Sequence, residues 1–416
     1  MKFNKWTLAL AAVGVVSMAS VARAEETPAP ANVLTALPAT TLSGYVDTSA
    51  SLNFGARYAG DGYPIPNYNM ENGGNLKRNG FSLNVVDVTL DHPEDTSEWA
   101  AGYHVELWFG PDGTSLGTSL DGSGDSIPAA IRQAYITLRT PIGGSQIDWK
   151  LGVFDTIIGY EGLTSYNNPC YSRSYGFNME PTTHTGLLAT YAVNSALTVQ
   201  AGVANTSYAG GYTAAIDGQN GVNGVSHTTQ PNLIFPTVMG AITLTAPDSW
   251  GWMKGASTTM GVINTASASG GKGATSFYAG LSVPTPMTAL KFGAAFDYLE
   301  MRDKNFDGAG PHNNSDWNAG LYASYQATDK LALNLRGEYL NNHTDNAFDS
   351  SNTQFGGDNA EEVTFDVSYD LWKNVLTRAE FRWDHPEHYK WFSNAGSSAY
   401  DVANAYLFAV QAIYKF

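Results

Sequence analysis

From residue 41 to residue 416 the sequence is a succession of segments, each about ten residues long, in which apolar and polar side chains alternate. We count sixteen such segments, the first at residues 42–54 and the last at residues 403–416. Successive side chains of a strand point to opposite faces, so each segment predicts a strand with one apolar and one polar face. Long stretches with helical spacing are absent, and the chain is therefore predicted to be all-β.

The polar faces of these segments carry many charges. In residues 331–340, leucines and a tyrosine share one face while Arg336 and Glu338 share the other. Residues 375–383 repeat this arrangement with Arg378 and Arg382 on the polar face. A sandwich core would not bury so much charge, and a solvated face would not be so continuously apolar. A barrel in a membrane accommodates both faces, because lipid covers the apolar one and water the charged one.

The connections between the segments alternate in length. Residues 55–79 and 110–129 are long connections, whereas residues 93–99 and 141–144 are short ones. Outer-membrane barrels have this asymmetry, with short periplasmic turns and long external loops. We therefore predict a transmembrane antiparallel β-barrel of the outer-membrane type with about 16 strands. Fourteen or eighteen strands would also fit, because the segments near Gly186 and Thr275 are weak.

The first residues have the pattern of a secretory signal peptide. Lys2 and Lys5 precede an apolar stretch that ends in Ala22-Arg23-Ala24. The stretch is shorter than the roughly 20 apolar residues that a membrane-spanning helix needs. We expect residues 1–24 to be removed, residues 25–40 to form a Pro/Ala-rich periplasmic linker and residues 41–416 to form the barrel, which places the protein in the outer membrane.

The charge balance excludes one class of partner. The chain has 22 Lys+Arg against 38 Asp+Glu, a formal net charge of −16. So acidic a protein is not expected to bind nucleic acid. Its single cysteine, Cys170, cannot form an internal disulfide, and we interpret it as an incidental small residue.

The final strand has a strongly aromatic face that ends at Phe416. Tyr406, Phe408, Val410 and Tyr414 share that face. In a barrel this strand would close the sheet, with its aromatic face in the lipid. A terminal strand of this kind resembles the signal by which the barrel-assembly machinery recognises its substrates, so that machinery is an expected partner.

One stretch also resembles a known family. Residues 152–161 read G-V-F-D-T-I-I-G-Y-E, and they are followed by Asn168, by Y-S-R-S-Y at residues 171–175, by Pro181 and by H-T-G at residues 184–186. This combination resembles the family called Putative beta-barrel porin, the group related to outer-membrane porin L. The resemblance implies an outer-membrane pore and supplies no catalytic residues.

The first candidate site is the inner wall. Charged residues at positions that should face inward form the predicted pore lining: Asp47, Glu106, Arg132, Asp148, Lys150, Lys291, Asp297, Arg336, Glu338, Asp366, Asp370, Arg378, Glu380 and Arg382. The strand that holds Arg132 has a less clear facing. Patches of opposite sign would create a transverse field that screens polar solutes. Alternatively, these residues are cross-strand charge pairs that stiffen the barrel.

The second candidate is the third long loop, residues 155–185. It combines charged and aromatic side chains, and we predict that it folds into the lumen as a constriction. Its candidate residues are Asp155, Glu161, Tyr171, Arg173, Tyr175, Glu180 and His184. The alternative is a compact external loop that is packed by its own aromatic rings.

A third candidate is a weak calcium motif. Asp303, Asn305 and Asp307 precede a glycine as in a calcium-binding loop, but the twelfth position is Asn314 instead of the usual glutamate. A hairpin loop rich in Asp, Asn and Gly needs no metal, so calcium is the weaker interpretation. Residues 384–388, D-H-P-E-H, place two histidines three residues apart but without helix geometry, and they are a still weaker metal candidate.

Together these features favour a passive porin for small hydrophilic solutes over an enzyme. The acidic excess of the predicted lining favours a weak preference for cations, and trimers would be usual for this strand number. Three alternatives remain open. They are a non-conducting surface or adhesion barrel that acts through its loops, a barrel-based lipase or protease, and a soluble secreted sandwich or lectin.

Overall fold

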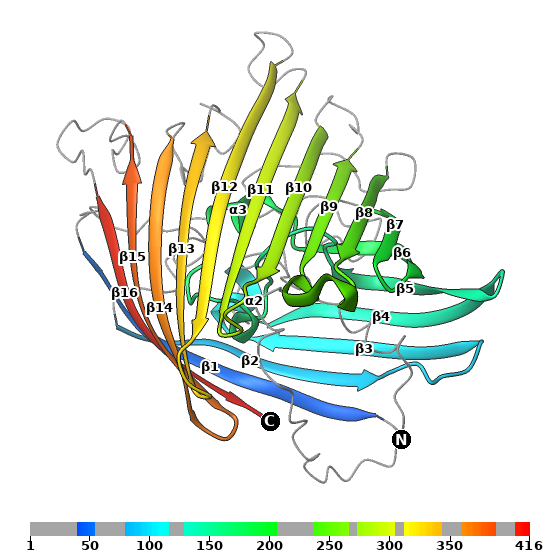
Figure 1. The fold of residues 1–416 in the computed structure, drawn as a ribbon, viewed down its shortest axis with the longest axis horizontal. Helices are drawn as coiled ribbons and strands as arrows, with labels where there is room; N and C mark the ends of the chain where they lie inside the picture. The colour runs from blue at the N-terminus through cyan, green and yellow to red at the C-terminus, as the bar shows by residue number, and fades with distance from the viewer. Residues whose placement is uncertain are drawn as a thin grey trace.

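The computed structural model describes residues 40–54, 80–115, 129–205, 236–265, 273–303, 312–342, 359–387 and 404–416. Sixteen strands form one closed antiparallel sheet in which each strand pairs with its neighbours in the sequence and β1 pairs with β16 (Figure 1). The predicted all-β barrel and its strand number are confirmed. The weak segments near Gly186 and Thr275 are the strands β6 and β10.

The strands follow the expected order along the chain. Their bounds are β1 Thr41–Phe54, β2 Gly80–His92, β3 Ala100–Phe109, β4 Ala129–Ile142, β5 Ser145–Asp155, β6 Thr183–Asn194, β7 Leu197–Ala204, β8 Thr237–Thr245, β9 Ser257–Thr265, β10 Gly273–Pro284, β11 Leu290–Asp303, β12 His312–Gln326, β13 Leu331–Asn342, β14 Ala360–Trp372, β15 Val375–Pro386 and β16 Ala405–Lys415. Short turns join each even-numbered strand from β2 to β14 to the odd-numbered strand that follows it, and all of them lie at one end of the barrel.

The helical segments within the described residues are short. They are α2 Pro111–Ser115, α3 Tyr175–Met179 and the 3-10 turns η2 Ser165–Asn167 and η3 Asp248–Met253. Among the described residues, no helix has the length and apolar character needed to cross a membrane. Both η2 and α3 belong to the connection between β5 and β6, and η3 lies in the turn between β8 and β9.

The alternation of side chains separates the outside of the barrel from the inside. Large apolar residues of β13–β16, such as Leu335, Phe365, Phe381 and Phe408, are exposed on the outer surface. The polar residues between them are buried inside the barrel. Exposed tryptophans, among them Trp372, lie near the short turns, as expected for side chains at a membrane interface.

The barrel closes between its first and last strands. The amide of Gly44 donates to the Phe416 carbonyl at 3.0 Å, and the amide of Phe416 donates to the Gly44 carbonyl at 2.9 Å. A Cβ atom on Gly44 would lie 2.8 Å from Cζ of the Phe416 ring and would also collide with the Asp87 carbonyl. The lack of a side chain at Gly44 therefore leaves room for the Phe416 ring.

Two bulges change the facing of side chains near the barrel's first strands. Asp47 pairs with Val85 and Thr48 with Leu83, so Asn84 is the extra residue of β2. The sequence places the break in alternation at Val85-Val86, next to this bulge. A second bulge lies between β3 and β4, where the pairing shifts after Glu106. The predicted signal peptide and the linker up to residue 39 lie outside the described residues.

Candidate functional site

The connection between β5 and β6, residues 156–182, lies inside the barrel and is called the inner loop below. Every residue from 168 to 184 is buried. At the base of the loop, the amide of Thr156 donates to the Thr182 carbonyl at 3.0 Å, so its two ends lie together. Of the residues expected in this loop, Asp155 ends β5 and His184 belongs to β6.

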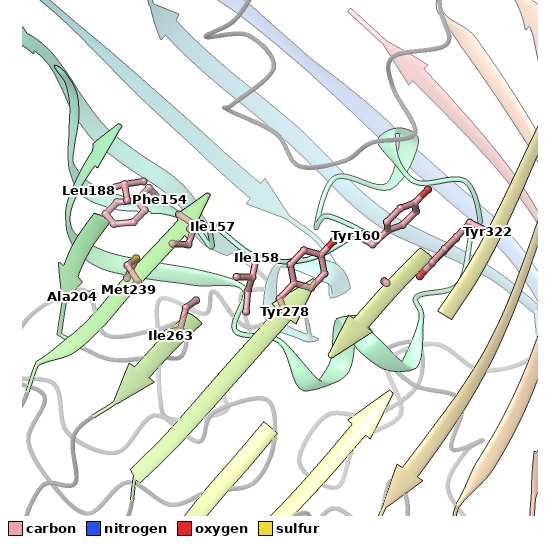
Figure 2. Close-up of a cluster of buried hydrophobic side chains, with 12 residues drawn as sticks. Phe154, Ile157, Ile158, Tyr160, Leu188, Ala204, Met239, Ile263, Tyr278 and Tyr322 are labelled. Atoms are coloured by element: carbon pink, nitrogen blue, oxygen red, sulfur yellow. The ribbon is translucent and has the colours of Figure 1, made fainter. Parts of the chain in front are cut away.

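The first part of the inner loop packs against a neutral wall formed by β7–β10. Ile157 and Ile158 belong to an apolar cluster with Met239, Ile263 and Tyr278 (Figure 2). Strands β7–β10 contain no charged residue. Apolar contact is therefore the main interaction between the inner loop and this wall.

Inward-facing glycines allow the inner loop to approach the wall closely. A Cβ on Gly261 would lie only 2.5 Å from Cγ2 of Ile158, and a Cβ on Gly293 would collide with the Tyr160 hydroxyl. The Tyr160 ring stacks on Tyr322 of β12 with 3.9 Å between the ring centroids. The loop thus crosses from the neutral wall to β12, where the inner surface of the barrel changes from neutral to charged.

The second part of the inner loop packs against a charged wall formed by β13–β15. Arg336 is fully buried and joins three partners. Its Nε donates to Oε1 of Glu362 at 2.7 Å, and its Nη1 donates to Oε1 of Glu161 at 2.8 Å. Nη1 also donates to the Ser172 carbonyl at 2.7 Å. Arg336 therefore links a wall carboxylate, a loop carboxylate and the loop backbone.

Two further arginines bind loop carbonyls. Arg382 donates to the Arg173 carbonyl at 2.6 Å and to Oδ1 of Asp384 at 2.7 Å. Arg378 donates to the Asn168 carbonyl at 2.5 Å. Buried carbonyls need hydrogen-bond partners, and these guanidinium groups supply them.

Carboxylates of the same wall accept from loop amides. Glu380 accepts from the amides of Tyr171 at 2.6 Å and Ser172 at 3.1 Å. Glu338 accepts from the amide of Tyr175 at 2.7 Å, at the first residue of α3. The charged wall therefore holds the inner loop in one register through its backbone.

The loop also reaches the seam of the barrel. The Tyr171 hydroxyl donates to Oγ of Ser49 on β1 at 2.9 Å. Gln411 on β16 donates to Oγ of Ser165 at 2.8 Å and to Oδ2 of Asp47 at 2.7 Å. With these contacts the inner loop spans the barrel interior from β7–β10 to β1 and β16.

Glu180 is a buried carboxyl group near the end of the inner loop. Burial and the nearby charge of Asp297 on β11 hold the pKa of Glu180 well above its usual range. A protonated Glu180 can share a hydrogen bond with the Asp297 carboxylate, whereas two ionised groups would repel each other. Docking of this part of the loop against β11 is therefore coupled to the protonation of Glu180.

The wall formed by β2–β5 is more open than the charged wall. His104 Nδ1 lies 3.0 Å from Oδ1 of Asp91, and the His104 ring stacks on Tyr135 with centroids 5.2 Å apart. The side chain of Asp91 is 38% exposed. The Nζ atom of Lys150 lies 4.7 Å from the centroid of the Tyr135 ring. These side chains form a partly exposed group that we call the β2–β5 shelf.

Arg132 lies beside this shelf at the bulge of β4. Its guanidinium forms a two-point ion pair with Asp155, in which Nη2 and Oδ2 are 2.8 Å apart. The neighbouring Gln133 also reaches Glu106, at 2.9 Å. The bulge brings two consecutive side chains to the inner face, which explains why alternation alone left the facing of Arg132 ambiguous.

At the short-turn end, Arg139 holds the turn between β2 and β3 against the wall. Its Nε donates to Oδ1 of Asp148 at 2.8 Å, and its Nη2 lies 3.1 Å from Oε2 of Glu94. Burial and the charge of Asp148 raise the pKa of Glu94 to about 7, although Arg139 opposes this shift. This turn therefore contains a group that titrates near neutral pH.

The residues predicted to line a pore separate into two sets. Those buried beneath or beside the inner loop are Asp47, Asp297, Arg336, Glu338, Asp366, Arg378, Glu380 and Arg382. Those on β2–β5 or near the short-turn end are Glu106, Arg132, Asp148, Lys150, Lys291 and Asp370. Among the loop residues, Arg173 donates to the Leu163 carbonyl at 2.6 Å and so braces the loop itself.

His104, Tyr135 and Glu362 were not among the predicted site residues, and Asp384 was considered only as part of the weak metal motif at residues 384–388. Glu362 and Asp384 continue the inward alternation of Asp366 and Arg382, so the same pattern could have identified them. The sequence places Tyr135 and His104 in strands but does not show that their rings stack. That contact depends on the register in which β3 pairs with β4.

The calcium candidate falls largely outside the described residues. Asn305 and Asp307 are not described, and Asp303 ends β11. Across the described part of the chain, no group of three or more His, Cys, Asp or Glu side chains could hold a metal ion. His388 of the other weak motif is also outside the described residues.

A family model described as "Putative beta-barrel porin-2, OmpL-like" matches residues 39–416. No curated protein matches the sequence.

Several solved porin structures share the fold. The outer-membrane channel DcaP of Acinetobacter baumannii has a TM-score of 0.58 at 13% identity, and the match covers 91% of this chain and 97% of DcaP. The anion-selective porin from Comamonas acidovorans has a TM-score of 0.56 at 12% identity, covering 91% and 99%. The trimer form of OmpT from Vibrio cholerae has a TM-score of 0.50 at 16% identity, covering 91% and 100%. At these identities the similarity concerns the fold alone.

Proposed function

Because the chain belongs to the OmpL-like beta-barrel porin-2 family, we propose that it is an outer-membrane porin for passive diffusion of small hydrophilic solutes. The observation that carries this proposal is the inner loop, which spans the interior between two walls of different chemistry. It leaves partly exposed charged side chains, such as Asp91, on the β2–β5 shelf. In this proposal the loop is the constriction and the shelf is the wall that solutes contact, and no residue has a catalytic role.

The proposed selectivity is a weak preference for cations. Carboxylates outnumber basic groups among the inward-facing residues named above, and charged rings or patches near a narrow passage bias which ions enter it. The buried arginines of β13–β15 contribute little to this bias, because loop carbonyls and carboxylates already neutralise or cover them, and the carboxylates buried beside them are covered in the same way. The partly exposed carboxylates of Asp91 and Asp155 contribute more.

A second function is favoured by one observation, the complete burial of residues 168–184. A loop packed so fully against the wall could close the lumen, and the barrel would then act through its external surface. This alternative predicts a folded, inserted protein that passes no current.

Reconstitution into a planar bilayer across a salt gradient tests both functions. Stepwise currents with a reversal potential of the sign expected for cations would support the proposed porin. Stepwise currents with the opposite sign would refute the cation preference alone. Inserted protein without current would refute the porin function and favour the second one.

The proposed partners follow from the same function. They are the lipid of the outer membrane, small hydrophilic solutes and the barrel-assembly machinery, which would bind the strand ending in Phe416. A homotrimer is proposed by analogy, since a related porin fold is described as a trimer. Cross-linking in native membranes would test the trimer.

A further inference from the structure

Several cationic side chains that the structure describes inside the barrel have an acidic partner close by. Arg336 and Arg382 are fully buried in ion pairs, and Arg132 pairs with Asp155. His104 lies against Asp91. These groups have little capacity left to bind a passing solute, because a new ligand would have to replace an existing partner.

Lys150 differs from these residues. Within the described part of the chain it forms no ion pair, and its close contact is with the ring of Tyr135. Asp155 and Asp91 interact with it only over a longer distance. Its side chain is partly exposed inside the barrel, in the middle of β5.

The Tyr135 ring supports the ammonium group. The ring attracts a cation through the negative charge of its face, and His104 stacks on the same ring. Such a contact holds the lysine in place without using a hydrogen-bond acceptor, so the ammonium group can still donate to a ligand. Cross-strand pairing of His104 with Tyr135 fixes the position of this arrangement.

We propose that Lys150 is a binding site for the carboxylate of small hydrophilic organic anions that pass the β2–β5 shelf. A carboxylate is the matching ligand because it accepts charge-assisted hydrogen bonds from an ammonium group. The inference rests on the proposed porin function and adds a solute class to it. A local anion site is compatible with an overall cation preference, because it acts only where a solute touches the shelf.

Liposome swelling with gluconate and sorbitol tests this site. Both solutes are hydrophilic open chains of similar size, and only gluconate carries a carboxylate. We expect Lys150→Gln to lower the ratio of the gluconate rate to the sorbitol rate by roughly three- to tenfold, the scale of the net free energy of one ordinary hydrogen bond. The sorbitol rate should stay unchanged, and Lys150→Arg should retain most of the ratio.

Lys291 offers a matched control. It also faces the interior and forms no ion pair among the described residues, but it lies near the short-turn end of β11. Lys291→Gln removes the same charge from the lumen, and we expect it to leave the ratio near the wild-type value.

Three results would overturn the inference. An unchanged ratio in Lys150→Gln would show that the carboxylate does not bind there. An equal fall in Lys291→Gln would show a general effect of lumen charge. Wild-type liposomes that swell with neither solute would refute the porin function itself, whereas swelling with sorbitol alongside an unchanged ratio would refute only the Lys150 site.

Discussion

Strands β7–β10 carry no charged side chain, whereas β13–β15 carry three arginines and several carboxylates, and the same inner loop rests on both walls. Contact with the neutral wall depends on apolar burial, as at Ile158. Contact with the charged wall depends on hydrogen bonds that link side chains such as Arg336 to the loop backbone. The inner loop is therefore attached to the barrel in two ways, and single substitutions are expected to weaken the two attachments to different extents.

Apolar burial is not directional, so the neutral wall can hold the loop without fixing its register. The charged wall fixes the register, because each donor needs its acceptor. Losing one partner there leaves other charges buried and uncompensated. We therefore expect single substitutions in the charged wall to have larger effects than equally conservative ones in the neutral wall.

The largest effect is expected from Arg336→Met. It leaves Glu161 and Glu362 without their main cationic partner, at a cost of about 3–5 kcal/mol to the docked loop. The loop should become susceptible to limited proteolysis, and the single-channel conductance should rise. The gel mobility of unheated and heated samples in SDS electrophoresis would show whether the barrel itself is folded.

Arg139→Met is the control for this substitution, since Arg139 is also ion-paired but holds the turn between β2 and β3 instead of the loop. If Arg336→Met left the loop as protected as the wild type, the charged wall would not be the stronger attachment.

A smaller effect is expected from Ile158→Ala on the neutral wall. The substitution leaves a cavity beside Gly261 and should weaken loop docking by about 2–4 kcal/mol. The same proteolysis experiment measures it, with the exposed Ile142→Ala as the control. An effect larger than that of Arg336→Met would reverse the proposed ranking of the two walls.

Docking of the inner loop is also expected to depend on pH, through Glu180. Its pKa is raised in the folded protein, so the docked loop binds this proton more tightly than the undocked loop does. The stabilisation is complete below about pH 4.5, the ordinary range for a glutamic acid, and is lost as the pH rises toward the raised pKa. Channel conductance should therefore increase at high pH.

Glu180→Gln supplies the test, because glutamine cannot ionise and the pH dependence should disappear. An unchanged pH profile in this variant would assign the effect to another group. Asp297, Glu161 and Glu338 are the carboxyl groups that interact with Glu180.

The smallest effect is expected at the turn that Arg139 holds. The pKa of Glu94 is about 7, so the docked turn loses stability as the pH rises from about 4.5 to about 7. After correction for the intrinsic exchange rate, which itself rises with pH, the protection factors of residues 93–99 should fall across this window in the wild type and stay constant in Glu94→Gln. Equal profiles for both proteins would contradict the assignment.

The sequence predicts the barrel well because every strand repeats the same constraint. Lipid outside and water inside impose alternation, and Phe365 and Phe381 show it as clearly as Arg336 and Arg382 do. Loop lengths then indicate which end of the barrel carries the short turns.

The arrangement of the interior could not be predicted in the same way. Alternation places Arg336 inside but does not reveal that the inner loop covers it, because that depends on the path of residues 156–182 through the lumen. The orientation of Arg132 depends on a bulge. The shelf depends on the register that puts His104 beside Tyr135, and no local pattern encodes it.

The seam between β1 and β16 has a consequence for the order of assembly. The hydrogen bonds between Gly44 and Phe416 join the first strand to the strand that follows all the others in the chain. While β16 is still missing, both β1 and β15 present an unpaired edge that could pair with another chain. Closure must therefore wait until β16 takes its place in the sheet, and until then the two open edges need protection from pairing with other chains.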